Sequence, residues 1–318
     1  MSNNLTNPIL LVGVGPMAVS YSEVLKALGQ SFVAISRSEA SALSFTEKTG
    51  VKAISGGVEN FLLQNPEDYS HAIVATGVEA LAAATKILLQ HGVKSILLEK
   101  PGAKNIAEIE DLHNYALGRD ASIFLAYNRR FYASVLKAKE IIAADGGVLS
   151  LNFEFTEWGH VIEKIQKAEG VKENWFLANS THVADLAFYI AGVPAEMVCF
   201  TSGGSEWHPS ATIFAGCGKT VNHVIFNYQA NWDAPGRWGV EILTAKHRLY
   251  LRPLEDLSIQ EKGSVAIHKV EFDDGLDKSF KPGLYLQVKN WLSGECGNLC
   301  TLTQQNTILP YYKKMSNY

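Results

Sequence analysis

The sequence predicts two domains, an α/β domain with a parallel sheet followed by an α+β domain with a large, open, mostly antiparallel sheet. Residues 1–126 alternate short, unbroken apolar runs with helical segments, which is typical of parallel strands covered by helices on both faces. Residues 127–318 carry longer segments of alternating β-branched and aromatic residues, which is typical of antiparallel strands. The length of 318 residues also exceeds one ordinary core. We therefore expect one domain over 1–126 and a second over 127–318.

The elements of the first domain follow from its apolar runs and their spacing. The expected strands are Ile9–Val12, Phe32–Ile35, Val51–Ile54, His71–Ala75, Ser95–Leu98 and Ser122–Ala126. The expected helices are Met17–Leu28, Ala40–Thr49, Val78–His91 and Ile106–Ala116. Gly29 and Gly50 stand just after two of these helices, where glycine is a common stop signal. Strands that alternate with helices in this way form a parallel sheet.

The second domain has a different pattern, with one helix expected at its start and another between its first two strands. These helices are Ser134–Ala144 and His182–Ala191. The expected strands are Val148–Glu157, Met197–Thr201, Ser210–Cys217, Thr220–Ala230, a strand or hairpin within Trp238–Arg252, and Ala266–Phe272. Gly218-Lys219 is the predicted hairpin turn between two of them. The tail is predicted to form helices over Leu284–Leu292 and Gln304–Lys313, which we expect to pack back on the first domain.

The composition excludes several classes of protein. It is 47% hydrophobic and 19% charged, with a formal net charge of -4 and no run of Lys and Arg, so a nucleic-acid partner is not expected. Residues 1–8 are polar and lack the pattern of a signal peptide, and no apolar stretch reaches the ~20 residues that span a bilayer. We expect a cytoplasmic protein without a membrane partner. The four cysteines are too sparse for a disulfide framework and lack the spacing of a metal site.

The strongest local signal is Gly13-Val14-Gly15-Pro16-Met17-Ala18, between the first expected strand and the first expected helix. Its first glycine permits a tight turn, its second lets the backbone approach a pyrophosphate, and its final alanine allows close helix–strand packing. The start of the helix offers N–H groups and partial positive charge to phosphates. A purely structural turn is the alternative, but the position favours a dinucleotide site in a Rossmann domain. The residues assigned to the cofactor here are Gly13, Gly15, Pro16 and Met17.

The residues after the second strand indicate which dinucleotide binds. An acidic residue there would bind the ribose of NAD, but this chain has Ser36-Arg37-Ser38. Arg37 can pair with a 2′-phosphate while the two hydroxyls donate beside it. The alternatives are that Arg37 is a solvated loop residue or that nearby Glu39 serves a ribose. We expect NADP as the cofactor, with NAD as the other possibility, and we assign Thr76 to the same site.

The fifth strand ends in Glu99-Lys100-Pro101. Ligands of an open parallel sheet lie outside the carboxyl ends of its strands, so we expect Glu99 and Lys100 to line the cofactor crevice. A lysine at a strand end is commonly just solvated, but the proline fixes this turn. Tyr127-Asn128-Arg129-Arg130-Phe131 follows the sixth strand and is expected in the same crevice.

These motifs, in this order and with His182 and Asp185 at the head of a helix, resemble the Gfo/Idh/MocA family of sugar and cyclitol oxidoreductases. The resemblance extends over nearly the whole chain. It implies a Rossmann domain joined to an open sheet, a homodimer or homotetramer formed through that sheet, and a Lys-Pro peptide that is often cis. One position departs from the family, which commonly has an Asp four residues before the His, where this chain has Ala178. The usual Lys-Asp-His trio is thereby reduced to Lys100 and His182.

Hydride transfer at a secondary alcohol needs an acid or base and a positive group beside the developing oxyanion. Lys100 is the candidate for the positive group and a proton relay. His182 is the candidate acid or base, because its unperturbed pKa lies near neutrality. Asn179 or Asp185 would have to compensate for Ala178. Asp185 shares a helix face with His182, although we favour its being a polar helix residue only.

Two groups of residues are candidates to contact the substrate. After the sixth strand, we assign Asn128 to the cofactor and Tyr127 and Arg129 to the substrate. Arg130 would bind an anion or pair with an internal Asp, and an interface salt bridge is the alternative for both arginines. In the polar, aromatic loop before His182, the candidates are Trp158, Asn174, Trp175 and Asn179, since aromatic faces stack on sugar rings. This loop and residues 231–238 can equally serve as an oligomer contact, because Trp and Arg are enriched there.

The leading interpretation is an NADP-preferring dehydrogenase or reductase that acts on a secondary alcohol or ketone of a sugar, nucleotide sugar or cyclitol. One alternative is an enzyme of the same fold that keeps its cofactor and catalyses isomerisation or glycosidic cleavage. A non-catalytic dinucleotide sensor is the third, which the Ala178 departure keeps open.

Overall fold

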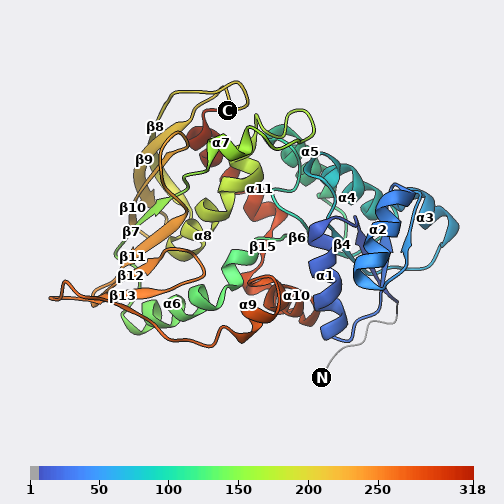
Figure 1. The fold of residues 1–318 in the computed structure, drawn as a ribbon, viewed down its shortest axis with the longest axis horizontal. Coiled ribbons are helices and arrows are strands. Elements are labelled where there is room, and N and C mark those ends of the chain that lie inside the picture. Colours follow the sequence, from blue (N-terminus) through green and yellow to red (C-terminus); the bar gives the residue numbers. More distant parts are fainter. Residues whose placement is uncertain (1–6) are drawn as a thin grey trace. The chain divides into compact units, whose positions relative to one another are not determined.

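The computed structural model describes residues 7–318, and the chain folds into two compact units (Figure 1). The first unit contains the chain up to Tyr127 together with Ser279–Thr307. The second contains Asn128–Lys278 together with Ile308–Tyr318. Each unit is built around a sheet of its own, which is almost entirely parallel in the first unit and mostly antiparallel in the second. The predicted fold class is therefore confirmed.

The first unit is a Rossmann-type sheet in the order β15-β6-β5-β4-β1-β2-β3. Its strands are β1 (Ile9–Val12), β2 (Phe32–Ile35), β3 (Ala53–Ile54), β4 (His71–Val74), β5 (Ser95–Leu98), β6 (Ser122–Leu125) and β15 (Cys300–Thr301). All neighbours are parallel except β15, which runs antiparallel to β6. Because β1 lies between β2 and β4, the strand order reverses beside it. Such a switch point is where ligands bind in open α/β sheets.

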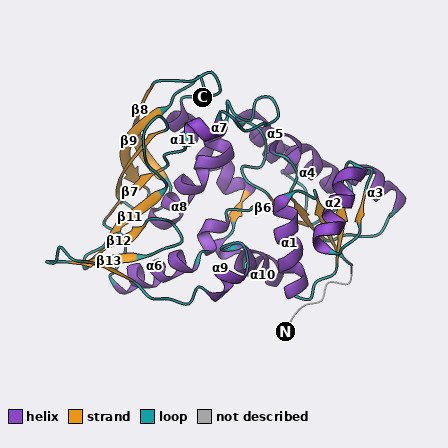
Figure 2. Ribbon diagram, in the orientation of Figure 1, coloured by secondary structure: helices purple, strands orange, loops and turns teal. Residues whose placement is uncertain are grey.

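Within residues 7–318, six helices lie wholly in this unit (Figure 2). They are α1 (Pro16–Ala27), α2 (Glu39–Thr49), α3 (Val58–Gln64), α4 (Leu81–Gln90), α5 (Ile106–Ala116) and α10 (Leu284–Ser293). α10 packs against α1. The predicted bounds of β1, β2, β5 and α5 agree with the structure residue for residue. The short helix α3 was not predicted, because its seven residues give too few turns for a clear periodicity.

The second unit is an open sheet in the order β14-β13-β12-β11-β7-β10-β9-β8. Its strands are β7 (Ser150–Glu154), β8 (Pro194–Ser202), β9 (Ile213–Thr220), β10 (Ile225–Asn231), β11 (Gly239–Leu243), β12 (His247–Leu251), β13 (Ser258–Glu261) and β14 (Ile267–Lys269). Only the pair β7–β10 is parallel among the pairs described. The Trp238–Arg252 segment forms the hairpin β11–β12, whereas β13 was not predicted.

The helices of this unit are α6 (Ala133–Ala144), α7 (Gly159–Ile162), α8 (Thr181–Ala191) and α9 (Gly275–Ser279). The last residue of α9 is assigned to the first unit, and the residues of α11 (Leu302–Ser316) are divided between the two units. α8 packs on β7 and β11, and α6 packs on β12. A π-helical segment, Phe176–Ser180, leads directly into α8. Irregular turns of this kind frequently occur at functional sites.

The predicted turn at Gly218-Lys219 is wrong. Both residues lie inside β9, where Gly218 pairs with Phe226, and the chain turns over residues 221–224. A Cβ on Gly218 would lie 2.2 Å from the carbonyl oxygen of Glu196 on the neighbouring strand. Glycine is therefore required there by close strand packing and not by a turn.

No helix within residues 7–318 is long and apolar enough to cross a membrane.

Candidate functional site

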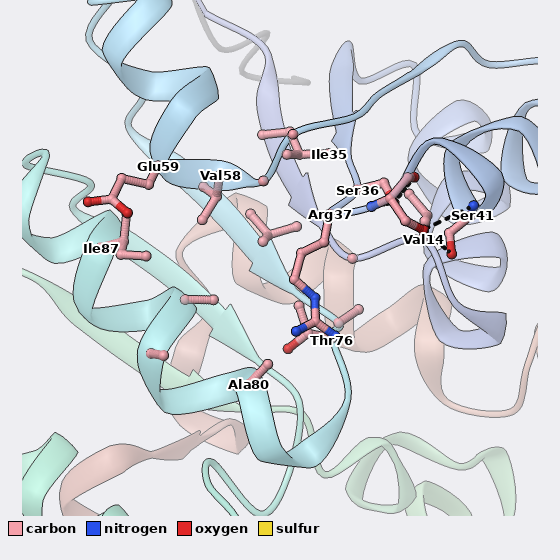
Figure 3. A pocket seen from close by; sticks show the side chains of 18 of the residues that line it. Val14, Ile35, Ser36, Arg37, Ser41, Val58, Glu59, Thr76, Ala80 and Ile87 are labelled. Carbon is pink, nitrogen blue, oxygen red and sulfur yellow. Dashed lines mark hydrogen bonds between the residues drawn. The ribbon is translucent and has the colours of Figure 1, made fainter. Parts of the chain in front are cut away.

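A cavity of about 740 Å³ opens at the carboxyl ends of β1, β2 and β4 in the first unit. The glycine turn after β1, the Ser36–Ser38 turn after β2, and Ala75 with Thr76 after β4 all line it (Figure 3). This position, beside the strand where the order reverses, is the one that the sheet topology predicts for a ligand.

The two glycines of the first turn have different physical roles. Gly13 adopts φ +103°, and a Cβ on it would lie 2.4 Å from the Ala75 carbonyl oxygen. Gly15 has an ordinary φ of -75°, and a Cβ on it would meet no atom within 4 Å. Gly13 is therefore required by the fold, whereas Gly15 leaves space at the cavity wall. That space suits the close approach of a phosphate to the backbone.

The start of α1 has the features of an anion-binding helix N-terminus. Pro16 is its first residue, and within the described chain no side chain caps the helix at Gly15. The N–H groups of the first turn then carry partial positive charge towards any ligand in the cavity. Ala18 is completely buried, which is the close helix–strand packing that the motif predicts.

The turn after β2 presents one cation. The Ser36 hydroxyl donates to the Ser38 carbonyl oxygen at 2.9 Å, and the Ser38 hydroxyl oxygen accepts from the Ser41 N–H at 3.3 Å as it caps α2. Both hydroxyls thus stabilise the turn itself. Arg37 is exposed, forms no ion pair with another described residue, and extends towards Thr76 across the cavity (Figure 3). Arg37 is therefore the charged group that this turn offers to a ligand.

Much of the remaining wall is apolar, and the sequence analysis did not assign it. Its apolar side chains are Val58 of α3, Ala80 just before α4, and Ala83, Ala84 and Ile87 of α4, while the polar side chains of Ser41, Glu59 and Asn60 also line the cavity. Apolar side chains beside the glycine turn suit the adenine ring of a dinucleotide. The signal was present as a run of small residues at the start of a predicted helix, but such runs also occur in ordinary helix packing.

The Glu99-Lys100-Pro101 turn is held from two sides within the first unit. The Tyr21 hydroxyl donates to Glu99 at 2.8 Å, and burial, followed by the charge of Glu99, raises the pKa of Tyr21. The Gln305 side chain donates to the Pro101 carbonyl oxygen at 3.2 Å. The Lys100–Pro101 peptide is cis, as the resemblance implied. Lys100 is therefore carried by a turn with fixed hydrogen-bond partners.

Tyr127 supports the same turn. Its side chain is 1% exposed, and its hydroxyl donates to Gln305 at 3.1 Å. Since Gln305 bonds in turn to Pro101, this geometry favours a positioning role for Tyr127 over direct contact with a substrate.

In the second unit, Arg129 joins two of the candidate residues. One of its terminal nitrogens donates to the Asn128 side-chain oxygen at 3.0 Å and lies 2.7 Å from Nε2 of His182. A guanidinium has no acceptor, so Nε2 of His182 accepts here and carries no proton. His182 is 5% exposed. The structure thus brings Asn128, Arg129 and His182 together, with the imidazole neutral at that nitrogen.

Arg130 and Asp185 form a buried, bidentate ion pair. The two hydrogen bonds are 2.8 and 2.6 Å long. Burial raises the pKa of Asp185, and the Arg130 guanidinium opposes that rise. Of the two roles considered for Arg130, pairing with an internal Asp is the one observed, and this pairing anchors Asp185 to Arg130.

A buried carboxylate that the sequence analysis missed lies beside the start of α8. Glu157 is 2% exposed, accepts from the Asn179 amide at 2.9 and 3.1 Å, and accepts from the Ser180 hydroxyl at 2.8 Å. Asn179 therefore holds Glu157 immediately before the helix that carries His182. Glu157 is remote from Asn179 in sequence, so only the fold reveals the pair.

The other loop candidates differ in exposure. Trp158 is 50% exposed and donates from its indole nitrogen to the Gly236 carbonyl oxygen at 3.1 Å. The Asn174 amide donates to the Gly170 carbonyl oxygen at 2.8 Å. Trp175 is 7% exposed and packs edge-on against Trp207. Trp158 is thus the aromatic face of this group that is open to solvent.

Comparison with known proteins identifies the first unit. Residues 8–127 match the model of GFO_IDH_MocA, an oxidoreductase family with an NAD-binding Rossmann fold. No curated protein matches the sequence.

Several solved structures share the fold of the whole chain. An oxidoreductase from Agrobacterium radiobacter, solved with NAD+, L-tartaric acid and magnesium, is 13% identical, with a TM-score of 0.76 over 96% of this chain and 93% of that one. The UDP-N-acetylglucosamine 3-dehydrogenase of Acidithiobacillus ferrooxidans is 15% identical, with a TM-score of 0.74 over 97% and 96%. A levoglucosan dehydrogenase solved with NADH is 14% identical, with a TM-score of 0.76 over 98% and 96%. At such identities the likeness concerns the fold.

Proposed function

We propose that the chain, whose residues 8–127 match an oxidoreductase family with an NAD-binding Rossmann fold, transfers a hydride to or from a secondary alcohol or ketone of a sugar, nucleotide sugar or cyclitol. The observation that carries the proposal is the cavity of the first unit, with open space at Gly15 and an uncapped helix start beside it. The sugar dehydrogenases among the structures of the same fold support the substrate class.

We propose further that the cofactor is NADP in preference to NAD. Arg37 supports this preference, because it is a cation without an ion pair among the described residues and it lines the cavity after β2. An arginine pairs well with a phosphate through two parallel N–H groups.

The preference is tested by titrating the protein with NADPH and NADH and following nicotinamide fluorescence. The wild-type chain should bind NADPH more tightly, and Arg37→Ala should weaken NADPH binding about tenfold, or ~1.4 kcal/mol, with little effect on NADH. Arg119→Ala is the control, since Arg119 packs on Tyr115 of α5 and does not line the cavity. Equal affinities for the two nucleotides, unaltered in Arg37→Ala, would refute the preference.

We assign the chemistry to Lys100 and His182. When bound, the nicotinamide ring donates or accepts the hydride. Lys100 stabilises negative charge on the substrate oxygen and relays its proton. His182 acts as the acid or base. Since Nε2 of His182 accepts from Arg129 at 2.7 Å, that contact must open before Nε2 takes a proton.

The assignment is tested on a panel of sugars, nucleotide sugars and cyclitols, scored by the absorbance of the reduced nicotinamide. Lys100→Ala should abolish turnover of any substrate found while NADPH still binds. His182→Ala should lower kcat and remove the ionisation that governs the pH profile. Full turnover by Lys100→Ala would overturn the catalytic assignment.

We also propose a homodimer or homotetramer that forms through the open sheet. The outer face of β8 and β10 supports it, because Val198, Phe200 and Ile225 are 55%, 67% and 55% exposed, and apolar patches of this kind mark interfaces. Analytical ultracentrifugation should show a Phe200→Lys variant to be more dissociated than the wild type. A wild-type monomer at high concentration would contradict the proposal.

A further inference from the structure

The wall of the cavity in the first unit carries two charged side chains of opposite sign. Among the described residues that line it, these are Arg37 after β2 and Glu59 of α3. Arg37 extends towards Thr76, whereas Glu59 extends towards Ile87 of α4 (Figure 3). A carboxylate repels the phosphates of a dinucleotide, so the proposed cofactor gives Glu59 a favourable role only if a neutral donor of the ligand meets it.

The fold itself does not use the Glu59 carboxylate. The side chain is exposed, and it forms no ion pair or hydrogen bond with another residue in the part of the chain that the structure describes. Lys86 of α4 pairs with Asp111 of α5. An ionised carboxylate accepts hydrogen bonds and donates none. Glu59 is therefore an acceptor that the cavity offers to a ligand.

The turn that precedes Glu59 is tied to the turn after β2. Gly56 and Gly57 adopt φ +107° and +86° and line the cavity. The Gly57 N–H donates to the Ser36 carbonyl oxygen at 2.8 Å. The Asn60 amide nitrogen donates to the Gly56 carbonyl oxygen at 2.9 Å, so it is engaged within the turn. These contacts fix the start of α3, which carries Glu59, against the turn that carries the proposed phosphate ligand.

Apolar side chains flank the carboxylate. Val58 precedes Glu59 in α3, and Ile87 lines the cavity on α4 together with Ala83 and Ala84. A planar base that packs on these side chains presents its polar edge at the margin of the apolar wall, where Glu59 lies. At that edge adenine carries an exocyclic amine, which donates, whereas a 6-oxo purine carries a carbonyl oxygen, which accepts.

We propose that Glu59 accepts a hydrogen bond from the exocyclic amine of the adenine ring and thereby selects an adenine dinucleotide over one that carries hypoxanthine. This inference rests on the proposed function, because it concerns the base of the cofactor at the same site. A carbonyl oxygen in place of the amine would face the carboxylate oxygens, and neither group donates a hydrogen bond. Glu59 thus determines specificity for the base, as Arg37 does for the ribose phosphate.

The test is titration of the full chain with two pairs of reduced dinucleotides that differ only in the base. NADPH is compared with reduced nicotinamide hypoxanthine dinucleotide phosphate, and NADH with its own hypoxanthine analogue, by nicotinamide fluorescence. Each adenine compound should bind about tenfold more tightly than its partner, because the analogue loses a hydrogen bond to a charged group. Equal affinities within either pair would overturn the proposal.

Variants of the carboxylate then locate the effect. Glu59→Ala should remove most of the preference for adenine. Glu59→Gln should bind the hypoxanthine compounds more tightly than the wild type does, because the new amide can donate to the carbonyl oxygen. Glu47→Ala is the matched control, since Glu47 is an exposed glutamate of α2 that does not line the cavity. An unchanged preference in Glu59→Ala would assign base recognition to another group and refute the role of Glu59.

The same titrations separate this inference from the proposals on which it rests. Both members of the NADPH pair carry the 2′-phosphate, so Arg37→Ala should weaken them alike and keep the preference for adenine. Binding of NADPH and NADH without a preference for the base would overturn the role of Glu59 and leave the proposed function standing. A wild-type chain that binds neither NADPH nor NADH would overturn the proposed function and this inference with it.

Discussion

Separate substitutions of the two glycines in the first turn should have different effects, one on the stability of the fold and the other on the affinity for the cofactor. In Gly13→Ala, the new Cβ would lie 2.4 Å from the Ala75 carbonyl oxygen, and the backbone would keep φ +103°. In Gly15→Ala, the new Cβ meets no atom within 4 Å and φ remains ordinary. The first variant should therefore lose stability, and the second should lose affinity for the dinucleotide.

The magnitudes follow from these geometries. An alanine held at positive φ costs roughly 1–3 kcal/mol, and forcing the end of β4 to shift adds roughly 1–3 kcal/mol. We expect Gly13→Ala to lower the free energy of unfolding by roughly 2–6 kcal/mol. Gly15→Ala exchanges one residue at the helix cap for a poorer one, which costs at most about 1 kcal/mol. Its methyl group points into the cavity where the pyrophosphate would lie, so the Kd for NADPH should rise at least about tenfold.

Urea denaturation measures the first effect, and NADPH fluorescence titration measures the second. Each variant serves as the control for the other. If Gly13→Ala were as stable as the wild type, the close approach to Ala75 would be wrong. If Gly15→Ala bound NADPH with unchanged affinity, the pyrophosphate would not lie at this turn.

Three further predictions concern other parts of the chain. Asp185→Asn leaves the Arg130 guanidinium buried without its charge partner and should cost about 3–5 kcal/mol in urea denaturation; a loss below about 1 kcal/mol would show that the pair is not buried. Tyr127→Phe removes the donor to a buried side-chain oxygen and should cost roughly 1–3 kcal/mol by the same measurement, whereas an unchanged midpoint would contradict that hydrogen bond. Burial raises the pKa of Asp145, but hydrogen bonds from Thr244 and the His247 side chain outweigh it and lower the pKa below the ordinary value. The stability that this depressed pKa contributes is present above the unfolded pKa of about 3.9 and is lost as the pH falls through the folded pKa. Asp145→Asn should therefore make the free energy of unfolding less dependent on pH in the acidic range. The same dependence on acidic pH in both proteins would refute this linkage.

The cofactor side of the site was predictable because its signals are local. The turn at Gly13–Gly15 and the charge of Arg37 depend on neighbours in sequence, and each follows a strand whose bounds the apolar pattern defines. The turn after β5 that carries Lys100 was predictable for the same reason. What the sequence did not show is that Tyr127 and Gln305 hold the Lys100 turn, because 178 residues separate that pair.

The contacts around the residues that we propose for the substrate were harder to predict because they are tertiary. Glu157 bonds to Asn179 across 22 residues, so its burial has no signature in the sequence around it. Trp238 and Arg237 were noted as a polar, aromatic segment, yet their relation to Arg129 and His182 requires the packed sheet. The hairpin turn was misplaced for a similar reason, since Gly218 is required by its close packing against a neighbouring strand and not by a turn.

The most direct test of the account is a crystal structure of the full chain with NADPH. The account predicts the pyrophosphate against Gly15 and the start of α1, the adenine beside Ala83 and Ala84, and the 2′-phosphate at Arg37. A nucleotide bound anywhere other than this cavity, or a cavity without nucleotide at saturating NADPH, would contradict it.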